Sequence, residues 1–156
     1  MTVHTVPVPD SLDQALSPQW LTGALRPRFP DLDITTVIPG PIVDRISTNA
    51  RFSIECVGDL PDGLPQALCV KGYFNEVGGA APQIGAPEAY FYRHIANQTR
   101  VRTLHSVYAD IDPATHHGVI ITEDVVAQGA TFLDGNSPYT PDQTAHSLTE
   151  LARLHA

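Results

Sequence analysis

The fold of this chain is decided by the stretch LCVKGYF at residues 68–74 and by PEAYFYRHIA at residues 87–96. The first stretch is apolar and ends in aromatic residues, which predicts a strand, and strand alternation turns Cys69 and Lys71 toward the same face. The second begins with a proline suited to a first helical turn and repeats apolar side chains at helical spacing. We therefore expect a strand followed by a helix that packs on its sheet.

Lys71 is the only lysine among the nine basic residues, and it lies in an otherwise apolar strand. A buried ammonium group needs a partner, because an unpaired one costs several kcal/mol or loses its proton. Glu88 lies on the only helix expected between the third and fourth strands, and it is the natural partner. The alternative is a surface lysine and an exposed glutamate that favours a helix N-terminus. An ion pair between Lys71 and Glu88 is the central prediction.

Five segments show strand-like composition, and turn signals such as Pro39-Gly40-Pro41 separate them. Most connections are too short for the crossover that parallel neighbours require, so the sheet should be antiparallel. With the helices around it, this predicts an α+β fold with a five-stranded antiparallel sheet. The expected strands are Ile34–Ile38, Phe52–Val57, Ala67–Tyr73, Val101–Ala109 and Gly118–Glu123.

The remaining segments suggest how the chain is organised. Residues 1–16 show no settled period and are expected to be an extended lead-in. The main unit, residues 17–125, begins with a helix that has Ser17 as its cap and Pro18 in its first turn. Within this unit, the segment 74–86 is rich in glycine, alanine and proline, and we expect it to be a mobile loop.

Residues 126–156 are expected to form a polar linker and the start of a second unit. Thr140-Pro141-Asp142-Gln143 is a capping box with proline at the first helical position, so it predicts a well-started helix. Nothing in the chain would cover the apolar stripe of this helix. A truncated module is therefore expected, and self-association through its last helix.

Composition excludes several classes of function. The 156-residue chain has a formal net charge of −8, which opposes general nucleic-acid binding. It has no apolar run of about 18 residues and no secretory signal at its start, so we expect a cytoplasmic protein that binds no membrane. Cys56 and Cys69 lack metal-ligand spacing and are expected to be reduced core thiols.

Four short motifs, taken in order, resemble a known family. They are VKGYF at 70–74, PEAYFYR at 87–93, ITEDV at 121–125 and LARLHA at 151–156. Together they are similar to the N-terminal lobe of the aminoglycoside phosphotransferase and choline-kinase-like group, and particularly its ecdysteroid-kinase-like branch, within the protein-kinase-like superfamily. The resemblance covers residues 17–156.

This resemblance implies a phosphotransferase that moves a phosphoryl group from ATP or GTP to a hydroxyl of a small molecule, with Mg²⁺ held mainly by a C-terminal lobe. Lys71 would orient the phosphates and Glu88 would hold Lys71. The loop 43–51 would cover the phosphates, and the segment 122–125 would be the hinge that seats the base. The implied site residues are Ser47, Thr48, Asn49, Lys71, Glu88, Thr122, Glu123 and Val125.

Plainer interpretations remain open for both segments. The loop 43–51 departs from the G-x-G-x-x-G pattern of protein kinases and is also typical of a polar hairpin turn. The acids Glu123 and Asp124 after a strand are also typical of a solvated turn. In the hinge interpretation, Thr122 controls access to the back of the pocket, while the Glu123 carbonyl and the Val125 amide bind the purine edge.

The catalytic loop H-x-D-x-x-x-x-N is absent from the sequence, so this chain alone is predicted to be inactive. No metal ligand is assigned. His116 and His117 form the nearest candidate with Asp110 and Asp112, but they fall at an expected hairpin tip that is normally solvated. The alternative function is a stand-alone, non-catalytic α+β module that binds a nucleotide or a protein partner.

Overall fold

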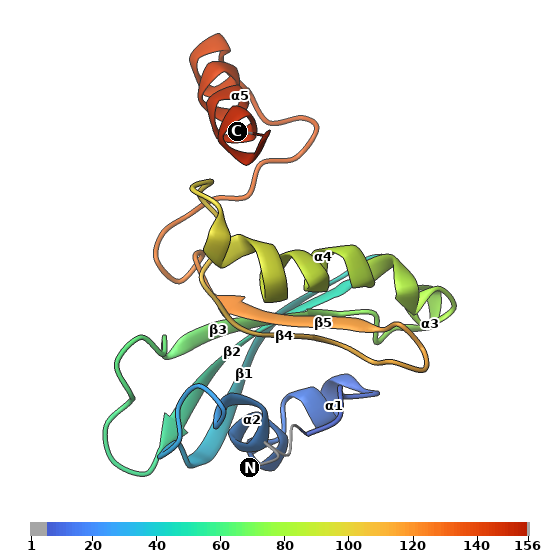
Figure 1. The fold of residues 1–156 in the computed structure, drawn as a ribbon, viewed down its shortest axis with the longest axis vertical. Helices are drawn as coiled ribbons and strands as arrows, with labels where there is room; N and C mark the ends of the chain where they lie inside the picture. Colours follow the sequence, from blue (N-terminus) through green and yellow to red (C-terminus); the bar gives the residue numbers. More distant parts are fainter. Residues whose placement is uncertain (1–5, 156) are drawn as a thin grey trace.

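The computed structural model describes residues 6–155. It confirms the predicted α+β class and the five-stranded antiparallel sheet, whose strands run in the order β1-β2-β3-β5-β4. Figure 1 shows helices on both faces of this sheet. The strands are β1 (Ile34–Asp44), β2 (Thr48–Cys56), β3 (Ala67–Gly72), β4 (Ser106–Ile111) and β5 (Gly118–Glu123).

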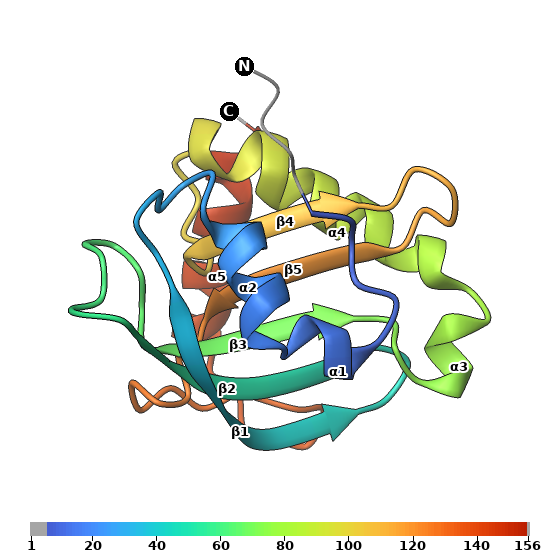
Figure 2. The same cartoon turned by 90° about the horizontal axis from the view of Figure 1, so that it is seen from below.

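One face of the sheet is covered by α1 (Leu12–Ala15) and α2 (Pro18–Leu25), which lie in front of the strands in Figure 2. The predicted cap is present, since the Ser17 hydroxyl accepts a hydrogen bond from the Trp20 amide. Strand alternation sends every second side chain of β2, β3 and β5 into this layer. The resulting core is apolar and includes Trp20, Leu21, Leu25, Ala50, Phe52, Ile54, Leu68, Val70, Val119 and Ile121.

The opposite face carries the helix predicted between β3 and β4. It consists of α4 (Ala86–Tyr90), a π-helical turn η2 (Phe91–Ile95) and a short 3-10 turn η3 (Ala96–Gln98). The helix packs on β4 and β5, as expected, and Figure 1 shows it lying along that face. It covers only part of the sheet, so the side chains of β2 and β3 on this face remain available for a site.

Several sequence predictions about local structure are wrong. β2 begins at Thr48 rather than Phe52, so only residues 45–47 of the expected loop 43–51 lie outside the strands. The lead-in is not entirely extended, because the Ser11 side chain caps a single turn of helix, α1. β1 does not stop at Pro39-Gly40-Pro41 but bulges there and continues to Asp44. Its edge position tolerates the prolines, which cannot donate to a ladder. The fourth strand begins at Ser106 rather than Val101.

The loop expected at 74–86 contains α3 (Glu76–Gly79) and the 3-10 turn η1 (Pro82–Gly85). Asn75 caps α3 by accepting a hydrogen bond from the Gly78 amide at 2.6 Å. Gly78 is required here because a Cβ atom would collide with the Ile46 carbonyl oxygen. Gly78 therefore allows close packing between α3 and the turn that joins β1 to β2.

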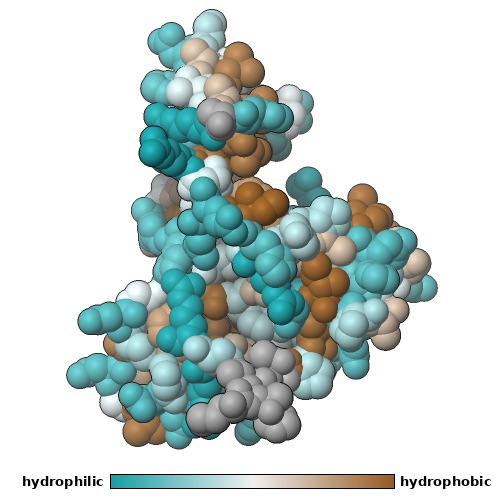
Figure 3. Space-filling model, viewed as in Figure 1, coloured by the Kyte–Doolittle hydropathy of each residue, from teal (hydrophilic) through white to brown (hydrophobic). Residues whose placement is uncertain are grey.

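The predicted final helix is α5 (Pro141–His155), and it stands apart from the sheet in Figure 1. The capping box forms, because the Gln143 amide donates to the Thr140 hydroxyl and the Thr140 amide donates to the Gln143 side chain. No residue of α5 is buried. Brown, apolar surface is visible on this helix in Figure 3. The exposed large apolar side chains of α5 are Leu148, Leu151 and Leu154.

Candidate functional site

A cavity of about 610 Å³ lies on the face of the sheet opposite the core. In the antiparallel register, the floor of the cavity consists of two rows of side chains. Each row contains one residue from β2, one from β3 and one from β5. Helix α4 and its π-helical continuation add Glu88 and Tyr92 to the wall, and the linker adds residues 132–135. The two rows are Asn49, Lys71 and Ile120, and then Arg51, Cys69 and Thr122.

The cavity gathers six of the eight site residues predicted from the sequence. Asn49, Lys71, Glu88, Thr122, Glu123 and Val125 line it. Ser47 and Thr48 do not. The Thr48 side chain is buried and its hydroxyl donates to the Asp44 carboxylate at 2.7 Å, so it is committed to closing the β-turn.

The predicted ion pair is present at one end of the cavity. The Lys71 ammonium nitrogen Nζ lies 2.6 Å from Oε2 of Glu88. The two side chains are 29% and 39% exposed, so water screens the pair and its contribution to stability is small. Its main effect is to hold a cation in a fixed position above the floor of the cavity.

The other end of the cavity is built from residues 122–125, which follow β5. Thr122 is buried, and its hydroxyl donates to the Glu123 carbonyl at 3.2 Å. The Val125 carbonyl accepts hydrogen bonds from the amides of Gln128 and Ala130. The Val125 amide has no acceptor among residues 6–155. This end therefore offers the Val125 amide as a main-chain donor, and the Glu123 carbonyl, two residues earlier, keeps one acceptor lone pair beyond its bond from Thr122.

The carboxylate of Glu123 is hydrogen-bonded within the chain and stabilises the segment 122–125. It accepts hydrogen bonds from the Gln128 side chain at 2.8 Å and from the His105 amide at 2.9 Å. These bonds, the Gln128 bond foremost, lower the pKa of Glu123. The His105 amide is thereby satisfied by a side chain instead of a ladder partner, which explains why β4 starts at Ser106.

A second ion pair, which sequence reasoning missed, crosses the cavity floor. Arg51 Nε lies 3.2 Å from Oδ1 of Asp124, and the same oxygen accepts the Val126 amide at 3.0 Å. Asp124 is buried, so the guanidinium neutralises a charge that would otherwise be costly. The signal in the sequence was Arg51 itself. A charged residue between the core-facing residues of a strand has to point to the opposite face of the sheet.

Cys69 lies on the cavity floor between the two ion pairs. Both Cys56 and Cys69 are free thiols, as expected. Neither is fully buried, however, and Cys69 lines the cavity rather than the core. Burial raises the pKa of the Cys69 thiol, which keeps it protonated and weakly nucleophilic.

The expectation of a solvated tip at His116-His117 is wrong for one of the two histidines. His116 is exposed with a positive φ of 59°, but His117 is only 7% exposed. Its Nε2 accepts a hydrogen bond from the Tyr73 amide at 2.9 Å. Burial lowers the pKa of His117. His117 thus locks the end of β3 to the start of β5. Within residues 6–155 no three His, Cys, Asp or Glu side chains gather as a metal site.

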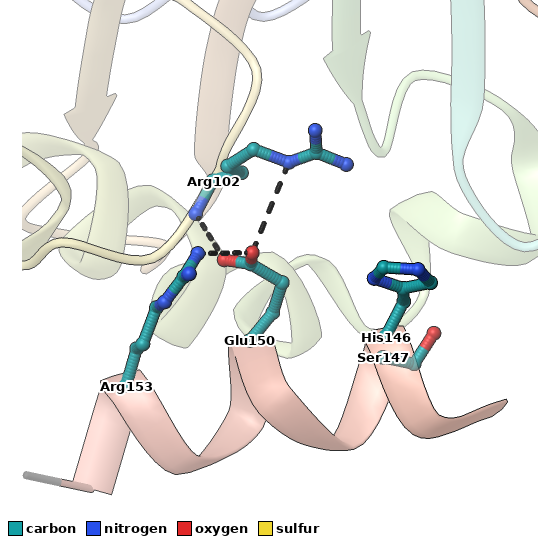
Figure 4. A pocket seen from close by; sticks show the side chains of 5 residues that line it. All are labelled: Arg102, His146, Ser147, Glu150 and Arg153. Carbon is teal, nitrogen blue, oxygen red and sulfur yellow. Dashed lines mark hydrogen bonds and ion pairs between the residues drawn. The ribbon is translucent and has the colours of Figure 1, made fainter. Parts of the chain in front are cut away.

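A smaller hollow of about 310 Å³ lies between α5 and the segment before β4. Figure 4 shows the Glu150 carboxylate at its centre, pointing toward Arg102 and Arg153. Glu150 Oε2 accepts the Arg102 amide at 2.9 Å, and Oε1 accepts Arg153 Nη1 at 2.5 Å. Because its acid is satisfied within the chain, this hollow serves to attach α5 to the rest of the molecule.

Comparisons with known proteins give no independent assignment of this site: no protein-family model, no curated protein and no solved structure matches the chain. Within residues 6–155, no helix combines the length and the apolar character needed to cross a bilayer.

Proposed function

We propose that the cavity binds a purine nucleoside triphosphate and that the chain is the nucleotide-binding lobe of a phosphotransferase that acts on a hydroxyl of a small molecule. The observation that carries this proposal is the placement of a fixed cation and a main-chain donor–acceptor pair at the two ends of one cavity. A nucleotide has the same polarity, with a hydrogen-bonding base edge at one end and anionic phosphates at the other.

The spacing of the two ends supports this assignment. Leu68 pairs with Glu123 in the β3–β5 ladder, and Lys71 follows three residues later on β3. At about 3.3 Å per residue, the ends are separated by roughly 10 Å along the strand, which leaves room for a ribose between them. The side chains of Cys69 and Ile120 supply flat, uncharged floor between the ends.

The ion pair supports the phosphate assignment by its own chemistry. Glu88 orients Lys71 without burying it, so the ammonium keeps hydrogen-bond donors free for phosphate oxygens. The resemblance also implies Mg²⁺. Among residues 6–155 no three His, Cys, Asp or Glu side chains gather into a metal cluster, and the proposal assigns no Mg²⁺ ligand to this chain. Binding of nucleotide is therefore its measurable property.

The test is isothermal titration of the chain with ATP and with GTP, each with and without Mg²⁺. We expect one of the two to bind and Lys71→Met to weaken that binding at least about tenfold, because a charge-assisted phosphate contact is lost. Arg100→Gln is the matched control, since it removes one charge from an exposed side chain that does not line the cavity. Unchanged affinity of Lys71→Met would remove Lys71 from the site.

A further inference from the structure

The cavity contains three cationic side chains, and they differ in how their charge is compensated. Lys71 is paired with Glu88 at 2.6 Å, and Arg51 is paired with Asp124 at 3.2 Å. The Arg45 side chain lines the same cavity, yet it makes no hydrogen bond or ion pair with any side chain or backbone group of residues 6–155. Arg45 is therefore the cavity cation whose guanidinium has no partner within residues 6–155 and is free to bind a ligand.

The backbone of Arg45 is nevertheless held firmly. Its amide donates to the Ser47 carbonyl at 3.2 Å, which closes the turn between β1 and β2. Its carbonyl accepts a hydrogen bond from the Asn75 side-chain amide at 2.8 Å, and the same amide nitrogen lies 2.5 Å from Asp44 Oδ1. Because Asn75 also caps α3, this turn is tied to a second element of the fold.

The position of Arg45 along the sheet indicates which part of a ligand it meets. Asp44 pairs with Thr48, and Thr48 pairs with Gly72, so the turn lies just beyond the Lys71 end of β3. The base-binding residues lie at the opposite end of this strand. Arg45 is thus farther from the base end than Lys71, and it is more exposed to solvent.

Asp134 is the carboxylate on the linker side of the cavity, and it forms no ion pair with Arg45. Its side chain binds the Ser137 hydroxyl at 2.9 Å and the Asn136 amide at 2.9 Å. These hydrogen bonds are the main reason that the pKa of Asp134 is lowered, and the charge of Arg45 adds to the effect. No Oδ atom of Asp134 comes within 4.0 Å of the guanidinium.

We propose that Arg45 binds the outer phosphates of the nucleotide and that Asn75 is the positioning residue that presents it; this inference rests on the proposed function. An arginine guanidinium presents two parallel N–H donors to two phosphate oxygens in a planar fork, a geometry that the point-like ammonium of lysine does not provide. A turn fixed through its backbone leaves only side-chain freedom to be lost on binding. Arg45 thereby takes the role that the sequence resemblance had implied for Ser47 and Thr48.

The test compares a series of ligands that differ only in phosphate number: adenosine, ADP and ATP, with guanosine, GDP and GTP in parallel. Dissociation constants are measured by titration calorimetry for the wild-type chain, Arg45→Gln, Arg45→Lys, Asn75→Ala and the control Arg100→Gln. In Arg45→Gln we expect about a tenfold loss of affinity for the triphosphate, a smaller loss for the diphosphate and none for the nucleoside. Arg45→Lys should recover part of the loss.

Asn75→Ala should shift triphosphate affinity in the same direction but by less, because the guanidinium is still present. The wild-type affinity for triphosphate should also fall more steeply with salt than that of Arg45→Gln. Equal triphosphate affinity in wild type and Arg45→Gln, or an equal loss for the nucleoside, would overturn this inference alone. Failure of the wild-type chain to bind any member of either series would instead overturn the proposed function, and the inference with it.

Discussion

The two faces of the central sheet are built from the same three strands but have opposite characters. Toward α2, alternate residues such as Phe52, Leu68 and Ile121 are apolar and at most 3% exposed. Toward the cavity, the intervening residues include Arg51 and Lys71, whose charges are paired with Asp124 after β5 and with Glu88 on α4. One face thus stabilises the fold by burying apolar side chains. The other face carries the polar and charged side chains that line the cavity. Substitutions on the two faces should therefore affect different measurements.

The largest effect is expected on the core face. Leu68 is fully buried near the start of β3, so Leu68→Ala removes contacts that the sheet and α2 cannot fully refill. We expect the free energy of unfolding to fall by about 2–5 kcal/mol. Urea denaturation followed by Trp20 fluorescence measures this change, because the chain has one tryptophan and it packs in the core.

The next residue along the same strand provides the matched control. Cys69 points to the cavity face and is partly exposed, and Cys69→Ala should change the free energy of unfolding by less than about 1 kcal/mol. Comparable losses at the two positions would mean that the two faces contribute equally to stability, and the contrast between them would fail.

The different character of the two faces could be predicted from the sequence, because the alternation of side chains along a strand depends only on local geometry. The pairing of Lys71 with Glu88 was predictable for a related reason: a lone cation in an apolar strand limits the choice of partner. Local rules were less successful at the sheet edge. β1 runs through Pro39-Gly40-Pro41 because a bulge on an edge strand removes the need for the missing donors.

Sequence reasoning missed the roles of several residues that contact another strand or loop. Thr48 was predicted to meet a ligand, but Asp44 occupies its hydroxyl, while the neighbouring Arg45 lines the cavity instead. His117 was expected to be solvated, but the strand β3 brings the Tyr73 amide to its ring nitrogen. Asp44 is four residues from Thr48 and Tyr73 is 44 residues from His117, and in both cases the sequence pattern does not show which groups meet.

Protonation of His117 should change the free energy of unfolding by an intermediate amount. His117 lies just before β5 and binds the Tyr73 amide at the end of β3. Burial lowers its pKa below the ordinary value of 6.5, while Asp10 and Asp112 oppose the shift only partly. As pH falls through 6.5, the unfolded chain takes up a proton before the folded chain does. The free energy of unfolding should therefore decrease as pH falls from about 7, and the decrease should level off below the folded pKa.

The measurement is a set of urea titrations between pH 7.5 and about pH 5, above the range in which carboxylates titrate. His117→Gln keeps an acceptor for the Tyr73 amide but cannot be protonated, so its stability should vary less over this range. His116→Asn is the control, because His116 is exposed and asparagine tolerates its positive φ. A slope that persists in His117→Gln would assign the pH dependence to another group.

The smallest effect on stability is expected at Lys71, which is the residue expected to matter most for binding. Because its ion pair with Glu88 is partly exposed, Lys71→Met should lower the free energy of unfolding by less than about 1 kcal/mol. A double-mutant cycle with Glu88→Gln should give a coupling energy of similar size. A loss of several kcal/mol would instead make the pair a structural element of the fold. A small loss combined with a large fall in nucleotide affinity would mean that the ammonium is held in place for a ligand, since the folded chain gains so little from holding it.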